Sequence, residues 1–247
     1  MRAVLRAELV KVRTTRTAFS LILGAIVVAA LGAASLTLSQ RADQLAGSLH
    51  GQQYFYVTSI VVSAFAVILG IRSFTDEFTF GSIVPTFTLA PRRGTVLAAK
   101  AVTSATGGGV LALLAAAVMV LVALALGVAK GARPALEGTD AAALGGLVVA
   151  GALWAVIGVG IGAAARHQIA AIVGAIVWIV IVETAASGFL GEAASFLPGH
   201  AGHALARASA GPDIGSPLFG AILLGLYAAV ALFLGRVFLR RDVEAAA

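Results

Sequence analysis

Residues 98–128 read AAKAVTSATGGGVLALLAAAVMVLVALALGV, and this stretch decides the class of fold. Lys100 is its only charged residue. A helix needs about 20 apolar residues to cross the hydrocarbon core of a bilayer. The stretch is longer than that, so it predicts either a tilted membrane span or a span that is broken at Gly107–Gly109. The sequence leaves both possibilities open.

The composition of the whole chain leads to the same class. Of its 247 residues, 60% are hydrophobic and 11% are charged, and the mean hydropathy is +1.01. Soluble domains carry about 25% charged residues, and a soluble fold of this size has too little interior for so much apolar surface. The composition argues against a soluble enzyme, a disordered chain and a nucleic-acid binder, and it indicates a polytopic membrane protein.

The apolar runs predict an all-α polytopic membrane protein, with one transmembrane domain over residues 1–247. Six spans are expected, at about 17–38, 54–71, 98–128, 141–165, 169–189 and 218–239. Residues 190–217 are too apolar for a free loop and too rich in Gly and Pro for a span. We expect them to form short helices on the outer side, either interfacial or re-entrant.

Basic residues predict the orientation of these spans, because cytoplasmic segments carry an excess of Lys and Arg. With the N-terminus placed in the cytoplasm, 13 of the 17 Lys and Arg fall inside, and Arg41, Lys130, Arg133 and Arg207 fall outside. Both termini are therefore expected to be cytoplasmic. The first apolar run, about 22 residues long, exceeds the 7–15 residues of a secretory signal core, so we expect it to remain as a span.

The stretch 72–93, RSFTDEFTFGSIVPTFTLAPRR, is cytoplasmic in this topology. Ser73 and Asp76 have the spacing of a capping box, which predicts a helix that begins there. Apolar residues from Phe80 to Phe87 then recur at helical spacing. Two interpretations stay open at this point: a helix that lies on lipid, and a helix that docks on a partner protein.

Several short motifs in this chain resemble the permeases of the type-2 ABC exporter family. In residues 72–93 they are Glu77-Phe78, Gly81-Ser82-Ile83, Pro85-Thr86 and Pro91-Arg92-Arg93, similar to the family pattern E-Y/F-x-x-G-T/S-I/L followed by Pro and a basic pair. Residues 8–16 are similar to the amphipathic N-terminal helix of the family. Residues 238–243 are similar to its last span, which runs into a basic pair and Asp.

The resemblance implies roles for two groups of residues. It implies a coupling helix over 72–93 that contacts an ATPase subunit through Asp76, Glu77, Phe78, Phe80, Gly81, Pro85, Pro91, Arg92 and Arg93. It also implies an amphipathic interfacial helix over 1–16 that carries Glu8, Lys11, Arg13 and Arg16.

The implied function is the permease subunit of an ATP-driven exporter in a bacterial plasma membrane. Its implied partners are two copies of an ABC-type ATPase and a second copy of this permease or a homologous one. The chain contains no G-x-x-x-x-G-K-[ST], the motif that holds nucleotide phosphates. We therefore expect no enzyme activity or cofactor in this chain, with ATP and Mg bound by the partner. The implied substrate is amphipathic: a drug, a lipid-like molecule or an antimicrobial peptide.

Glu183 lies in the fifth expected span, and an ionisable group inside a membrane is by default a functional candidate. It is expected either to pair with an outer arginine such as Arg207 or to lie on a substrate path or gate. His200 and His203, with Glu192 nearby, are weighed as zinc ligands, but the segment is irregular and we expect no metal site and no catalytic residue. An ion-coupled secondary transporter and a membrane-embedded lipid enzyme remain as alternative functions.

The fourth span carries Gly158-x-x-x-Gly162, a spacing that lets membrane helices approach closely. Such a face packs either within one subunit or between two subunits. We favour packing within the subunit, because Gly is frequent in membrane helices generally.

The charge asymmetry gives a testable topology. Labels placed after Ala247 and within residues 72–93 should both be protected from an impermeant external reagent in intact cells, because both sites are expected inside. A matched label beside Lys130 should react. External reactivity at either of the first two sites would contradict the topology.

Overall fold

The computed structural model describes residues 8, 11, 16–45, 47–49, 53–81, 93–132, 134–206 and 215–244. Its helices are α2 (Arg16–Ser39), α3 (Tyr54–Thr79), α5 (Arg93–Ala129), α6 (Gly138–Ala165), α7 (Gln168–Val177), α8 (Glu183–Leu190), α9 (Pro198–Leu205) and α10 (Pro217–Glu244). A π-helix, η2 (Trp178–Val182), joins α7 to α8, and a 3-10 helix, η3 (Gly191–Phe196), precedes α9. Two-residue strands β1 (Gly47–Ser48) and β2 (Pro134–Ala135) pair in parallel.

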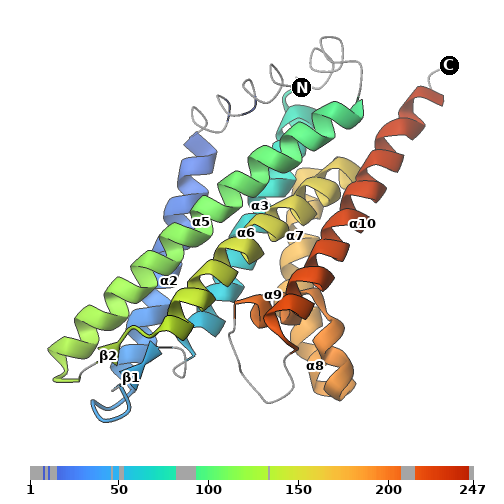
Figure 1. The fold of residues 1–247 in the computed structure, drawn as a ribbon. Coiled ribbons are helices and arrows are strands. Elements are labelled where there is room, and N and C mark those ends of the chain that lie inside the picture. Colours follow the sequence, from blue (N-terminus) through green and yellow to red (C-terminus); the bar gives the residue numbers. More distant parts are fainter. Residues whose placement is uncertain are drawn as a thin grey trace.

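Within these residues, six helical segments are long and apolar enough to cross a membrane, as expected. They are α2, α3, α5, α6, the run Gln168–Phe196, and Pro217–Leu239 of α10. The prediction of an all-helical, multi-pass membrane protein is therefore confirmed. Figure 1 shows the start of α5 and the ends of α3, α6 and α10 at one end of the bundle, and β1, β2, α8 and α9 at the other.

Helix α6 packs against α3 with their backbones almost in contact. A Cβ on Gly158 would overlap the carbonyl oxygen of Val67, and one on Gly70 would overlap that of Ala155. A Cβ on Gly162 would likewise lie 2.5 Å from the carbonyl oxygen of Ile71 in α3. The small-residue face of the fourth span therefore packs within the subunit, as favoured from the sequence.

One expectation about helix boundaries is corrected, and one open question is answered. No helix begins at Ser73: α3 runs unbroken from Tyr54 to Thr79, and the Ser73 hydroxyl donates to the carbonyl of Gly70, 2.7 Å away, within that helix. Expected span two and the first residues of the expected coupling helix are thus one continuous rod. Helix α5 is also unbroken, since Gly107–Gly109 are buried in its middle. Its 37 residues span roughly 55 Å at 1.5 Å per residue, well over the thickness of a bilayer core.

The expected outer segment 190–217 contains short helices, of which η3 and α9 are described. Helix α9 is packed inside the bundle rather than lying free. Its Leu205 carbonyl lies where a Cβ of Gly146 in α6 would be, and the Ala201 carbonyl oxygen lies 2.5 Å from the position of a Cβ on Gly220 in α10. Close approaches on two sides therefore fix α9 between α6 and α10.

Long basic side chains tie the helix ends together. Lys130, just after α5, donates to the carbonyls of Thr37 and Leu38 at the end of α2, at 2.9 and 3.1 Å. These carbonyls lack partners in their own helix, so the ammonium group satisfies them. At the other end, the guanidinium of Arg166 donates to the carbonyl of Phe238, 2.7 Å away.

The α3–α6 contact predicts a specific sensitivity. Gly158→Ala should lower the thermal stability of the purified protein, because overpacking a tight contact costs about 1–3 kcal/mol. Gly145→Ala is the matched control in the same helix, since a Cβ there meets nothing within 4 Å. Melting temperatures in detergent compare the two, and equal values would contradict the packing described.

Candidate functional site

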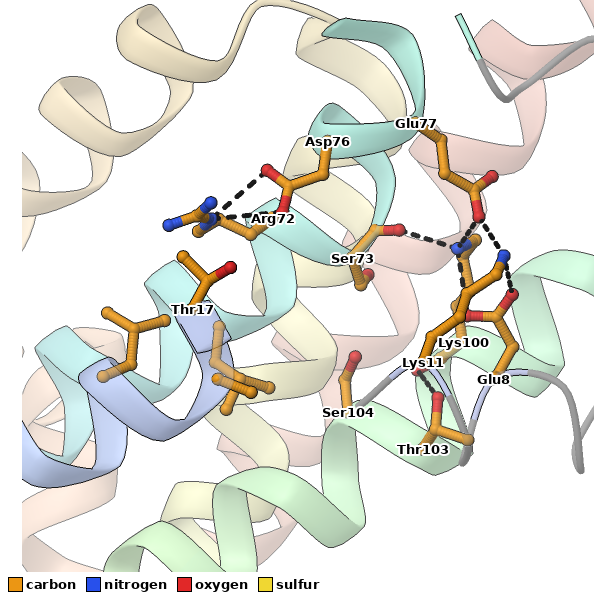
Figure 2. A pocket seen from close by; sticks show the side chains of 13 residues that line it. Glu8, Lys11, Thr17, Arg72, Ser73, Asp76, Glu77, Lys100, Thr103 and Ser104 are labelled. Carbon is orange, nitrogen blue, oxygen red and sulfur yellow. Dashed lines mark hydrogen bonds and ion pairs between the residues drawn. The ribbon is translucent and has the colours of Figure 1, made fainter. Parts of the chain in front are cut away.

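A cavity of about 130 Å³ lies where the N-terminal segment meets α2, α3 and α5, and charged side chains line it. Figure 2 shows how they gather: Glu8 and Lys11 come from the N-terminal segment, Glu77 from α3, and Lys100 from α5. The cavity lies at the end of the bundle where α3 ends and α5 begins. We call these four residues the ionic cluster.

Lys100 is the centre of the ionic cluster, and its side chain is 1% exposed. Its ammonium group donates to Oε1 of Glu77 at 2.8 Å, to Oε2 of Glu8 at 3.1 Å and to the carbonyl of Ser73 at 2.7 Å. It also lies 5.2 Å from the centroid of the Phe74 ring, within the range of a cation–π contact. All three ammonium protons thus have acceptors.

Lys11 completes the cluster from its half-exposed side. It donates to Oε1 of Glu77 at 2.6 Å and to Oε1 of Glu8 at 3.0 Å. Partial burial opposes the charge of Lys11, but the hydrogen bonds to Glu77 and Glu8 outweigh burial and raise its pKa. Lys11 therefore stays protonated at neutral pH, and the cluster combines two basic with two acidic side chains.

The arrangement fastens three parts of the chain to each other. Each of the two carboxylates accepts hydrogen bonds from both ammonium groups, which suits fixing geometry rather than transferring protons. Buried charges are tolerated when they are paired and hydrogen-bonded. One acceptor is left over: within the described part of the chain, Oε2 of Glu77 is buried and has no hydrogen-bond partner.

The structure brings together three of the residues singled out from the sequence, Glu8, Lys11 and Glu77. Sequence reasoning did not single out Lys100 as a site residue. Its position as the only charged residue in residues 98–128 could have indicated a buried partner of opposite charge. Asp76 lies outside the cluster and pairs with Arg72 one turn earlier, at 3.2 Å.

The other expected coupling residues have different surroundings. Phe78 is partly buried against Phe74 and its neighbours, whereas Phe80 is 78% exposed at the end of α3. Gly81 follows with φ of +69°, a backbone conformation that favours glycine. Arg93 begins α5 and donates to the carbonyl of Leu239, and Arg16 begins α2. Arg13, Pro85, Pro91 and Arg92 lie outside the described residues.

Glu183 lies at the other end of the bundle, 5% exposed. Its Oε1 accepts from the indole N–H of Trp178 at 3.0 Å, and its carboxylate accepts from the backbone N–H of Gly199 at the start of α9. The expected partner Arg207 is not among the described residues. Gly199 is required for this approach, since a Cβ there would overlap Oε2 of Glu183.

His203 of α9 serves packing. His203 is buried, its Nδ1 is hydrogen-bonded to the hydroxyl of Ser59, and its ring stacks at 4.5 Å on Tyr56. Burial lowers the pKa of His203 to about 3, with a smaller effect from His200. Across the described ranges, no three His, Cys, Asp or Glu side chains gather as they would around a metal ion.

The ionic cluster gives a second prediction. Lys100→Met leaves two buried carboxylates with Lys11 alone, and removing one partner of a buried ion pair costs about 3–5 kcal/mol. We expect the melting temperature in detergent to fall by roughly 10 °C.

Two further variants test whether charge is the cause. Lys100→Met combined with Glu77→Gln removes one cation and one anion, so it should recover part of the loss. Arg72→Gln breaks only a partly exposed pair within one helix, worth about 0.3–0.5 kcal/mol, and serves as control. Equal losses for Lys100→Met and Arg72→Gln would contradict the central role of Lys100.

Comparison with known proteins adds no assignment to this site. No family model matches the chain, and no curated protein matches it.

Proposed function

We propose that this chain is the permease subunit of an ATP-driven ABC exporter. In this proposal a separate ATPase binds and hydrolyses ATP with Mg, and two permeases pair in a bacterial plasma membrane to move an amphipathic substrate outward. The ionic cluster is the observation that carries the proposal. It joins α3, α5 and the N-terminal segment at the end of the bundle where α3 presents an exposed aromatic side chain.

Force transmission needs a rigid link between a docking point and the spans. Helix α3 supplies one, because it continues without a break from the glycine contact at Gly70 to Thr79. Glu77, near its end, is bonded to Lys100 of α5. A displacement applied at the end of α3 would therefore move α5 and the N-terminal segment with it.

Phe80 is the best candidate for the docking anchor. It is exposed directly after the last helical residue of α3, and Gly81 beside it has a positive φ, a conformation that does not continue the helix. Glu77 and Phe78 face the cluster and the core instead. A partner that binds at this end could contact Phe80, and a force on Phe80 would act directly on α3.

An ion-coupled secondary transporter is less well supported. Such proteins use paired ionisable groups near the midplane of the bilayer. Glu77 and Lys100 of the ionic cluster lie near the end of α3 and the start of α5, which meet at one end of the bundle (Figure 1). Among the described residues, Glu183 is bonded to an indole and a backbone amide and to no other ionisable group.

Co-purification tests the proposal. Tagged chain isolated from its native membranes should bring down an ABC-type ATPase, identified by mass spectrometry. Phe80→Ala should reduce its recovery roughly 30-fold, because truncating an anchor of this kind costs about 2 kcal/mol.

Phe233→Ala is the matched control, since Phe233 is 65% exposed in the middle of α10. Glu77→Lys cannot test docking, because it would place a third cation between Lys11 and Lys100 and so disturb the fold itself. Recovery of no ATPase with the unmodified chain would refute the proposal, and equal recovery with both Phe variants would remove Phe80 as the anchor.

A further inference from the structure

A second, larger cavity of about 520 Å³ lies among α6, α7, η2 and α10. Its walls are almost entirely apolar, and three aromatic side chains, Trp154, Trp178 and Tyr227, line it together with aliphatic residues such as Ile161 and Leu234. Cavities that bind small organic molecules measure about 300–1,000 Å³. The volume therefore suits a small organic ligand with a bulky apolar body.

A polar pocket of about 80 Å³ adjoins this cavity. Glu183, Ser187 and His200 line the pocket, and Ile179 belongs to the walls of both spaces. Trp178 joins them chemically, because its ring lines the apolar cavity while its N–H donates to Glu183. Together the two spaces are amphipathic: a large apolar chamber with a carboxylate at one side.

The π-helix creates this connection. In α-helical geometry residues five apart point in different directions, whereas π-type bonds link residue i to residue i+5. Here the backbone N–H of Glu183 donates to the carbonyl of Trp178, and the Trp178 side chain donates to the Glu183 carboxylate. Single π-turns of this kind occur frequently at functional sites.

Within the described residues, the carboxylate of Glu183 has no positively charged partner. Both groups that bond to it, the Trp178 indole and the Gly199 amide, are uncharged donors. No Lys or Arg among the residues placed by the structure forms an ion pair with it. Burial lowers the pKa of His200 and of His203, so both histidines near the pocket are neutral at pH 7. A buried carboxylate without a cation is costly, and a cationic ligand would relieve that cost.

We propose that the 520 Å³ cavity binds an amphipathic monovalent cation, with its apolar body against Trp154 and Tyr227 and its cationic centre beside Trp178 and Glu183. Indole rings attract cations through their faces, and Glu183 supplies the opposite charge. Binding at this site is independent of any ATPase. Its assignment as the site of the transported substrate rests on the proposed function.

The chain supplies its own reporter of binding. It contains two tryptophans, and both line the cavity. Full-length protein held in an amphipol that contains no tryptophan is titrated with tetraphenylphosphonium, an aromatic monocation, and in parallel with neutral triphenylphosphine oxide. We expect a saturable change in tryptophan fluorescence with the cation, at a concentration at least tenfold lower than with the neutral compound.

Three variants locate the site. Glu183→Gln keeps an acceptor for the Trp178 N–H and should weaken cation binding at least tenfold while leaving the neutral compound unaffected. Gly174→Leu should abolish binding of both, because Gly174 lines the cavity and a Cβ there meets nothing within 4 Å. Gly225→Leu, at an equally open position outside the cavity wall, is the matched control and should bind normally.

Each outcome decides the proposal. Loss of discrimination in Glu183→Gln, or loss of binding in Gly174→Leu but not in Gly225→Leu, supports it. Equal affinity for the cation and the neutral compound, or for the parent and Glu183→Gln, would show a cavity for lipid chains only and overturn it. So would an absence of saturable cation binding to the parent. Recovery of the ATPase is measured separately, so failure of one proposal is distinguishable from failure of the other.

Discussion

The backbone contact between α3 and α6 is the constraint on which the rest of this structure depends. Between helices surrounded by lipid there is little hydrophobic driving force, so close packing and polar contacts must supply the attraction. Gly70 and Gly158 permit that packing by letting each helix reach the carbonyls of the other. With α3 fixed on α6, its distal end is held at a set distance from α5, which also packs on α6 at Gly108 and Gly151. The ionic cluster forms in the space so defined.

The ionic cluster and the glycine contact stabilise the fold by opposite means. The glycine contact gains dispersion energy by removing side chains, whereas the cluster places four charged side chains in one small space. Its cost is tolerable because the charges balance and Lys100 has an acceptor for every proton. The two features meet in α3, which carries Gly70 in its packed part and Glu77 near its end.

Sequence periodicity predicted the six apolar helices well, because span length and apolar composition are local properties. It failed at Ser73, where a local capping pattern lies inside a helix that continues to Thr79 and buries Phe74 and Glu77. It found Glu8, Lys11 and Glu77 only through a family resemblance, and it missed Lys100, because pairing across 92 residues leaves no local pattern. The sequence also did not predict the hydrogen bond between Trp178 and Glu183, because residues five apart do not lie side by side on an α-helix.

The spans differ in how much of their surface is buried inside the bundle, and the large cavity lies where the least is buried. In the most apolar 18-residue stretch of each span, 67% of the residues are buried in α3 and 61% in α6. The corresponding shares are 17% in Gln168–Phe196 and 22% in α10. The cavity lies between the well-packed α6 and these two loosely packed segments. A ligand in the cavity therefore borders the loosely packed segments, and its binding does not require the glycine contact of α3 with α6 to separate. The π-turn that sets Trp178 against Glu183 lies in Gln168–Phe196, so the residues that would bind the ligand's charge belong to the least buried of the six apolar segments.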